Sequence, residues 1–122
     1  MRWASAVWLL LVTAGSLAPL KVKVQLHTVG SWHNIFHFFA FCLGGLLFLV
    51  PAASSRAVVL RAVALALFCA VIEYLEAVVY HNKFEWRDFY LDCFSLSVAW
   101  LLSFPVRRLV ARAHPAGLRP YG

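Results

Sequence analysis

The chain has 122 residues, of which 63% are hydrophobic and only 13% are charged, with a formal net charge of +6. A soluble domain of this size is usually about half apolar and about a quarter charged, so this composition excludes an ordinary soluble globular domain. The basic residues flank apolar segments instead of forming a stripe, which argues against nucleic acid as a partner and predicts an integral membrane protein.

Four apolar segments follow one another along the chain, and we expect each to form a transmembrane helix. Each approaches the ~20 residues that cross ~30 Å of hydrocarbon. A helix is favoured in lipid because it satisfies every backbone polar group within the segment. The prediction is an all-α integral membrane bundle, a single domain over 1–122. Its parts are four transmembrane helices at about 3–20, 35–53, 57–80 and 89–104 and a basic cytoplasmic tail at 105–122.

The first segment also has features of a secretory signal peptide, so two interpretations stay open for it. Ser16-Leu17-Ala18 is an acceptable cleavage site after the apolar stretch. Pro19 follows that site directly, and a proline there is unfavourable for cleavage. We therefore expect an uncleaved helix.

The basic residues predict the orientation of the bundle. Four spans would place seven arginines on one side of the membrane: Arg2, Arg56, Arg61, Arg107, Arg108, Arg112 and Arg119. The other side would carry Lys21, Lys23, Lys83 and Arg87. Because positive charge is retained on the cytoplasmic side, we expect both termini in the cytoplasm and the tail along the anionic inner leaflet.

Three pairs of titratable residues recur at helical spacing, one pair in each of the last three segments. The pairs are His33 and His37, Glu73 and Glu76, and Asp88 and Asp92. Residues three or four apart share one helix face, and a charged side chain in the bilayer interior costs from ~2.5 kcal/mol upward. An antiparallel bundle would bring the three faces to the same outer depth. We therefore expect a polar cluster that faces inward and opens to the outer surface. Either imidazolium from His33 or His37, or Lys83 and Arg87 at the rim, would offset its negative charge.

Three interpretations of this cluster stay open: a hydrogen-bonded network that fixes helix packing, a ligand site or proton relay, and a metal site. The ligand would be a polar molecule, a cation or a lipid headgroup. Histidine with carboxylates suits zinc, iron or manganese, although no Glu-x-x-His motif occurs here. Asp88 has a further role available, because an acid in the first turn of a helix complements its dipole. No cofactor is predicted beyond a possible metal ion, whose candidate ligands are His33, His37, Glu73 and Glu76.

Motifs around these pairs resemble the VanZ-like family of small bacterial membrane proteins over residues 33 to about 100. "HNIFHFFAF" supplies His37 and its following phenylalanine, "IEYLE" supplies Glu73, and "FEWRDFYLD" supplies Asp88. Glu76 stands where the family has Gln, and Asp92 stands where it has Asn. His33 and Asn34 replace the family's Asp-Lys pair, which weakens the match at that point.

The resemblance implies a protein of the bacterial cytoplasmic membrane, in cell-envelope or glycopeptide stress, and brings no settled activity. We expect a lipid-linked or cell-envelope ligand, or a cation, to bind at His37, Glu73 and Asp88, with His33, Glu76 and Asp92 around them. Two alternatives stay open. One is an intramembrane enzyme acting on a lipid headgroup, although no nucleophile motif such as G-x-S-x-G occurs. The other is a structural subunit that packs against a homo-oligomeric or membrane partner.

Overall fold

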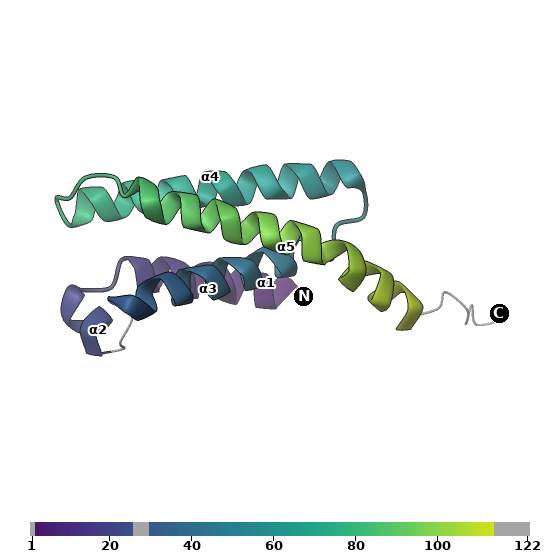
Figure 1. The fold of residues 1–122 in the computed structure, drawn as a ribbon, viewed down its shortest axis with the longest axis horizontal. Coiled ribbons are helices and arrows are strands. Elements are labelled where there is room, and N and C mark those ends of the chain that lie inside the picture. Colours follow the sequence, from purple (N-terminus) through teal and green to yellow (C-terminus); the bar gives the residue numbers. More distant parts are fainter. Residues whose placement is uncertain (1, 26–29, 114–122) are drawn as a thin grey trace.

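A computed structural model of the chain describes residues 2–25 and 30–113, and every regular element in these ranges is a helix. The predicted tail residues 114–122 lie outside the described part. The helices are α1 (Arg2–Ser16), α2 (Leu20–Gln25), α3 (Ser31–Leu49), α4 (Ser55–Val79) and α5 (Trp86–Ala113) (Figure 1). The expected all-α fold class is therefore confirmed for the described residues.

The helices α3, α4 and α5 are each long and apolar enough to cross a membrane. Their outward faces carry large apolar side chains, for example Leu67 and Leu101, which are 63% and 61% exposed. Water would penalise such faces, whereas lipid accommodates a helix that is apolar all round. The structure thus supports membrane integration.

The first predicted helix, 3–20, is shorter in the structure than expected. α1 ends at Ser16 and a separate short helix, α2, begins at Leu20. Pro19 lies in the break, where its ring removes a backbone donor and disfavours helical geometry at the residue before it. The 15 residues of α1 extend roughly 22 Å at ~1.5 Å per residue, which is less than the ~30 Å of a full span.

The last predicted helix, 89–104, was expected to end before Pro105, and this boundary is wrong. α5 begins at Trp86 and continues through Pro105 to Ala113, so part of the predicted tail is helical. The part of α5 that follows Pro105 turns away from the other helices (Figure 1). There Arg107 Nη2 donates a hydrogen bond of 2.7 Å to the carbonyl of Ala52, which ties α5 to the α3–α4 connection.

Small residues bring α3 close to both α1 and α5. A Cβ added to Gly44 would lie 2.1 Å from the Trp8 ring of α1, and one added to Gly45 would lie 2.4 Å from Cβ of Ala99 in α5. Real Cβ atoms do not approach so closely. The diglycine therefore determines how near the neighbouring helices come to α3.

Substituting Gly45 by alanine is expected to destabilise the bundle by about 1–3 kcal/mol, because the added methyl group overlaps Ala99. Gly15→Ala is the matched control, since nothing lies within 4 Å of an added Cβ there. That control should leave stability unchanged or raise it by up to ~1 kcal/mol through helix propensity. Equilibrium unfolding in mixed micelles measures both changes, and equal stability of the two variants would refute the packing argument.

Candidate functional site

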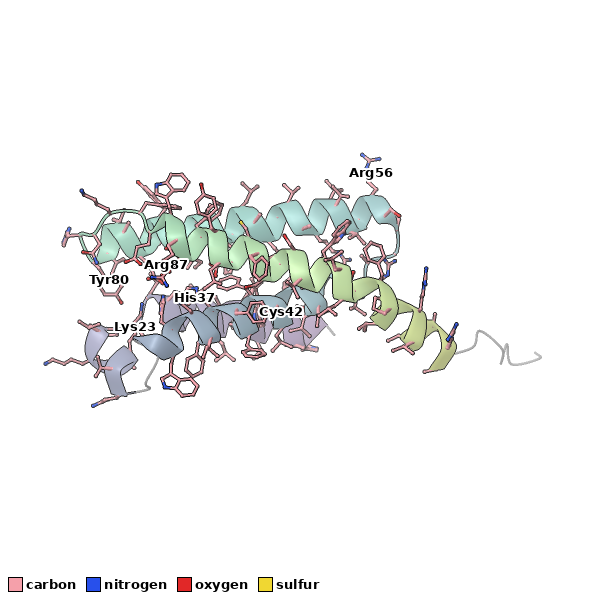
Figure 2. All side chains as sticks on the ribbon, viewed as in Figure 1. Lys23, His37, Cys42, Arg56, Tyr80 and Arg87 are labelled. Atoms are coloured by element: carbon pink, nitrogen blue, oxygen red, sulfur yellow. The ribbon has the colours of Figure 1, made fainter. Side chains whose placement is uncertain are left out.

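Polar side chains gather at the end of the bundle where α4 ends and α3 and α5 begin. Figure 2 shows Lys23, His37, Tyr80 and Arg87 toward this end, whereas Arg56 lies at the opposite end. All three titratable pairs are near this first end, because α3 and α5 run antiparallel to α4 (Figure 1). We call His33, His37, Glu73, Glu76, Asp88 and Asp92 the polar cluster.

Two histidine–aspartate pairs connect α3 to α5. His33 Nε2 lies 2.7 Å from Asp88 Oδ2, and His37 Nδ1 lies 2.9 Å from Asp92 Oδ1. A carboxylate can only accept, so the ring N–H donates in each pair. The two histidines are four residues apart in α3 and the two aspartates are four residues apart in α5, so a histidine–aspartate contact recurs on successive helical turns. The two imidazole rings lie 4.3 Å apart between centroids, so the pairs form one continuous polar ladder.

Burial increases along this ladder from the end of the bundle toward its interior. The side chains of His33 and Asp88 are 31% and 10% exposed, whereas those of His37 and Asp92 are 14% and 0% exposed. Asp92 Oδ2 is buried and has no hydrogen-bond partner in the described part of the chain. The inner pair therefore contains a polar atom that the fold itself does not satisfy.

Glu73 of α4 faces the inner pair. It is 3% exposed, and one of its oxygens lies within 4.8 Å of ligand atoms of His37 and Asp92. A second group of three potential ligands is formed by His33, His37 and Asp88. The structure thus brings together five of the six residues predicted for the cluster, although whether they bind a ligand stays a prediction.

Glu76, the sixth residue, belongs to neither group and instead pairs with a cation that the sequence did not single out. Lys23 Nζ of α2 lies 3.4 Å from Glu76 Oε2 and 5.1 Å from the centre of the Tyr80 ring. The Tyr80 hydroxyl donates to the carbonyl of Ala18 and so fixes the segment that leads into α2. The cation beside Glu76 is therefore Lys23 of α2, whereas the sequence had suggested Lys83 and Arg87.

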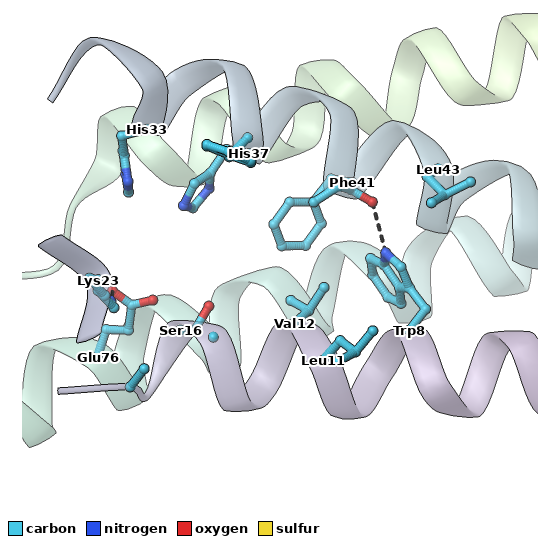
Figure 3. Close-up of a pocket in the computed structure, with 14 residues that line it drawn as sticks. Trp8, Leu11, Val12, Ser16, Lys23, His33, His37, Phe41, Leu43 and Glu76 are labelled. Atoms are coloured by element: carbon cyan, nitrogen blue, oxygen red, sulfur yellow. Dashed lines mark hydrogen bonds and ion pairs between the residues drawn. The ribbon is translucent and has the colours of Figure 1, made fainter. Parts of the chain in front are cut away.

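A cavity of about 350 Å³ lies between α1 and α3 beside the polar cluster. Its walls are mainly apolar, with Leu11 and Val12 on one side and Phe41 and Leu43 on the other (Figure 3). Its polar lining is concentrated at one end, where His33, His37, Lys23, Glu76 and Ser16 lie (Figure 3). The cavity is therefore amphipathic along its length.

Glu85 lies at the edge of the cluster, in the connection between α4 and α5, next to Asp88. Its side chain is exposed. Partial desolvation and the nearby Asp88 carboxylate raise the pKa of Glu85 above its usual range. The folded state therefore holds the proton of Glu85 more tightly than the unfolded state does. The resulting contribution to stability is present below the usual pKa of a glutamate and is lost as pH rises through the raised pKa.

Two serines of α5, Ser95 and Ser97, use their hydroxyl groups within their own helix. Ser95 Oγ donates to the carbonyl of Leu91 at 2.7 Å, and Ser97 Oγ donates to the carbonyl of Cys93 at 2.8 Å. Such bonds to the preceding helical turn are a common way for serine to satisfy its hydroxyl in a helix. In this arrangement the hydroxyl hydrogens of Ser95 and Ser97 point to the backbone and not to a histidine of the cluster.

No protein-family model matches the chain, and neither the curated proteins nor the solved structures contain a match to it. The resemblance to the VanZ-like family stays a prediction from the motifs alone.

Proposed function

We propose that this protein binds a lipid-linked amphiphile, with the apolar part in the cavity between α1 and α3 and the headgroup at the polar cluster. The observation that carries this proposal is the distribution of the cavity lining. Apolar side chains line most of the cavity, and the charged groups lie at one end. A binding cavity of this kind is complementary to a molecule with one apolar and one polar part.

The mixed chemistry of the polar end favours a headgroup rich in hydroxyl groups. Of the four carboxylates in the polar cluster, Glu76 lines the cavity, together with its partner Lys23 and with His33, His37 and Ser16. Carboxylate oxygens accept hydrogen bonds from hydroxyl groups, and the lysine ammonium and the serine hydroxyl donate to them. A sugar headgroup would therefore find both donors and acceptors at this end.

The membrane arrangement belongs to the same proposal. Here α1 accompanies three full spans as a shorter fourth segment, with both termini in the cytoplasm and the polar cluster at the outer side. Arginines predominate at the opposite end of the bundle, which supports this orientation. With the VanZ-like motifs, the arrangement supports the bacterial cytoplasmic membrane as the location and cell-envelope or glycopeptide stress as the context.

The substitution Ser16→Phe is expected to lower the number of bound lipid molecules about tenfold, which corresponds to ~1.4 kcal/mol of binding free energy. Ser16 lines the cavity next to its polar end, so the added ring would fill space that the ligand needs (Figure 3). Ala14→Phe is the control, because Ala14 is exposed on the same helix and does not line the cavity. Native mass spectrometry of protein purified with its lipids counts the bound molecules, and equal occupancy in both variants would count against the proposal.

The outer histidine–aspartate pair favours a second candidate function, an intramembrane enzyme acting on a lipid headgroup. Asp88 orients the His33 ring at 2.7 Å, which is the arrangement of a general base with its positioning carboxylate. His33 also lines the polar end of the cavity, where a headgroup would lie. Release of a water-soluble product from a bound lipid would distinguish this function from binding alone.

A further inference from the structure

The inner part of the polar cluster has more buried carboxyl groups than basic groups among the described residues. Asp92 is 0% exposed and Glu73 is 3% exposed, and the cluster offers them one nearby imidazole, that of His37. Asp92 Oδ2 has no partner among the described residues. Burying a carboxylate without a compensating charge or donor is costly. A cation bound beside these carboxyl groups would supply the partner that the described part of the chain does not.

The three inner side chains lie close enough together to be ligands of one metal ion. His37 comes from α3, Glu73 from α4 and Asp92 from α5, and each offers a ligand atom within 4.8 Å of the others. Atoms bound to one tetrahedral ion lie roughly 3.4 Å apart, as expected for ligand bonds of ~2.0–2.2 Å. An ion bound through His37 Nδ1 would displace the proton that this nitrogen shares with Asp92 Oδ1, 2.9 Å away.

We propose that His37, Glu73 and Asp92 bind one divalent transition-metal ion of the zinc class. One imidazole and two carboxylates are a suitable ligand set, and two negative charges balance the ion. Three protein ligands leave a fourth position open, as in zinc sites that bind water or substrate. This site does not depend on amphiphile binding.

The neighbouring group of His33, His37 and Asp88 is less suited to hold the ion. Asp88 Oδ2 already accepts a bond of 2.7 Å from His33, and both side chains reach the surface of the bundle. By contrast, Asp92 keeps an unpartnered oxygen in the interior. The inner triad is therefore the site that a metal ion would complete.

Cobalt titration of the full-length chain tests the proposal directly. The protein is purified in detergent, stripped with EDTA and titrated with Co²⁺, whose visible absorption reports four-coordinate binding. We expect saturation at one ion per chain and displacement by Zn²⁺. Protons could neutralise the carboxylates instead, and in that case no saturable absorption would develop and the proposal would be overturned.

Charge-neutral variants then test which residues bind the ion. Glu73→Gln and Asp92→Asn should each weaken Co²⁺ binding at least about a hundredfold, since loss of even an outer-shell partner costs about 10–100-fold. Glu85→Gln removes the same charge from an exposed position outside the triad and should keep full affinity. Unchanged affinity in the Glu73 variant, or an equal loss in the Glu85 variant, would contradict the assignment. Because the unmodified chain is titrated as well, misfolding of a variant would not leave the proposal untested.

Discussion

Replacement of His37 by leucine is expected to lower the free energy of unfolding by about 1–3 kcal/mol, the usual cost of leaving a buried polar group without its hydrogen-bond partner. Asp92 Oδ1 would lose the ring N–H that lies 2.9 Å away, and Asp92 Oδ2 already has no partner among the described residues. A fully buried carboxylate would then have neither oxygen satisfied within the described structure. Equilibrium unfolding in mixed micelles, with EDTA present to exclude metal effects, measures the change.

A double variant and an outer-pair variant act as controls for this result. His37→Leu with Asp92→Leu removes both partners, and it should recover most of the lost stability because the carboxyl group that the single variant leaves without a donor is removed as well. His33→Leu breaks the outer pair, whose side chains are more exposed, and should cost less. If the two single histidine variants were equally destabilised, burial of the inner pair would not be the cause.

Replacement of Trp8 by alanine is expected to destabilise the protein by about 3–5 kcal/mol, because a large buried ring is replaced by a cavity. Trp8 is 6% exposed, and its ring lies 5.8 to 6.0 Å from those of Phe41, Phe48 and Phe68. Its Nε1 also donates a hydrogen bond of 2.8 Å to the carbonyl of Ala40 (Figure 3). Thermal unfolding in detergent, followed by circular dichroism, measures the loss.

Two further tryptophan variants separate the contributions to this effect. Trp8→Phe keeps an aromatic ring and loses the hydrogen bond, so it should cost less than Trp8→Ala. Trp3→Ala removes a tryptophan from the same helix, but Trp3 is 85% exposed and should tolerate the change. A Trp3 variant as unstable as the Trp8 variant would show that the indole contacts between α1 and α3 are not decisive.

Trp8 also connects stability to the candidate site. It lines the cavity and connects α1 to α3, so removal of its ring would weaken the contact between α1 and that wall. Gly44 makes room for the ring, since an added Cβ would overlap it. The amphipathic cavity therefore depends on one tryptophan and one glycine that the polar motifs do not include.

The sequence located the third apolar segment well. The predicted segment 57–80 corresponds to α4, Ser55–Val79, which Ser54 caps by accepting a hydrogen bond from the backbone of Ala57. Prediction was less accurate at Pro19 and Pro105. The helix is interrupted at Pro19 but continues through Pro105, where Arg107 holds the following turn to Ala52. That tertiary contact has no local signal in the sequence.

The sequence alone determined which residues carry the polar chemistry and which helix face each pair shares, because helical spacing is a local property. Only the tertiary structure decided their partners. His37 pairs with Asp92, Glu76 pairs with Lys23, and one oxygen of Asp92 has no partner within residues 2–25 and 30–113. These pairings depend on the rotation and separation of neighbouring helices, which are set by long-range packing such as that of Gly45 against Ala99.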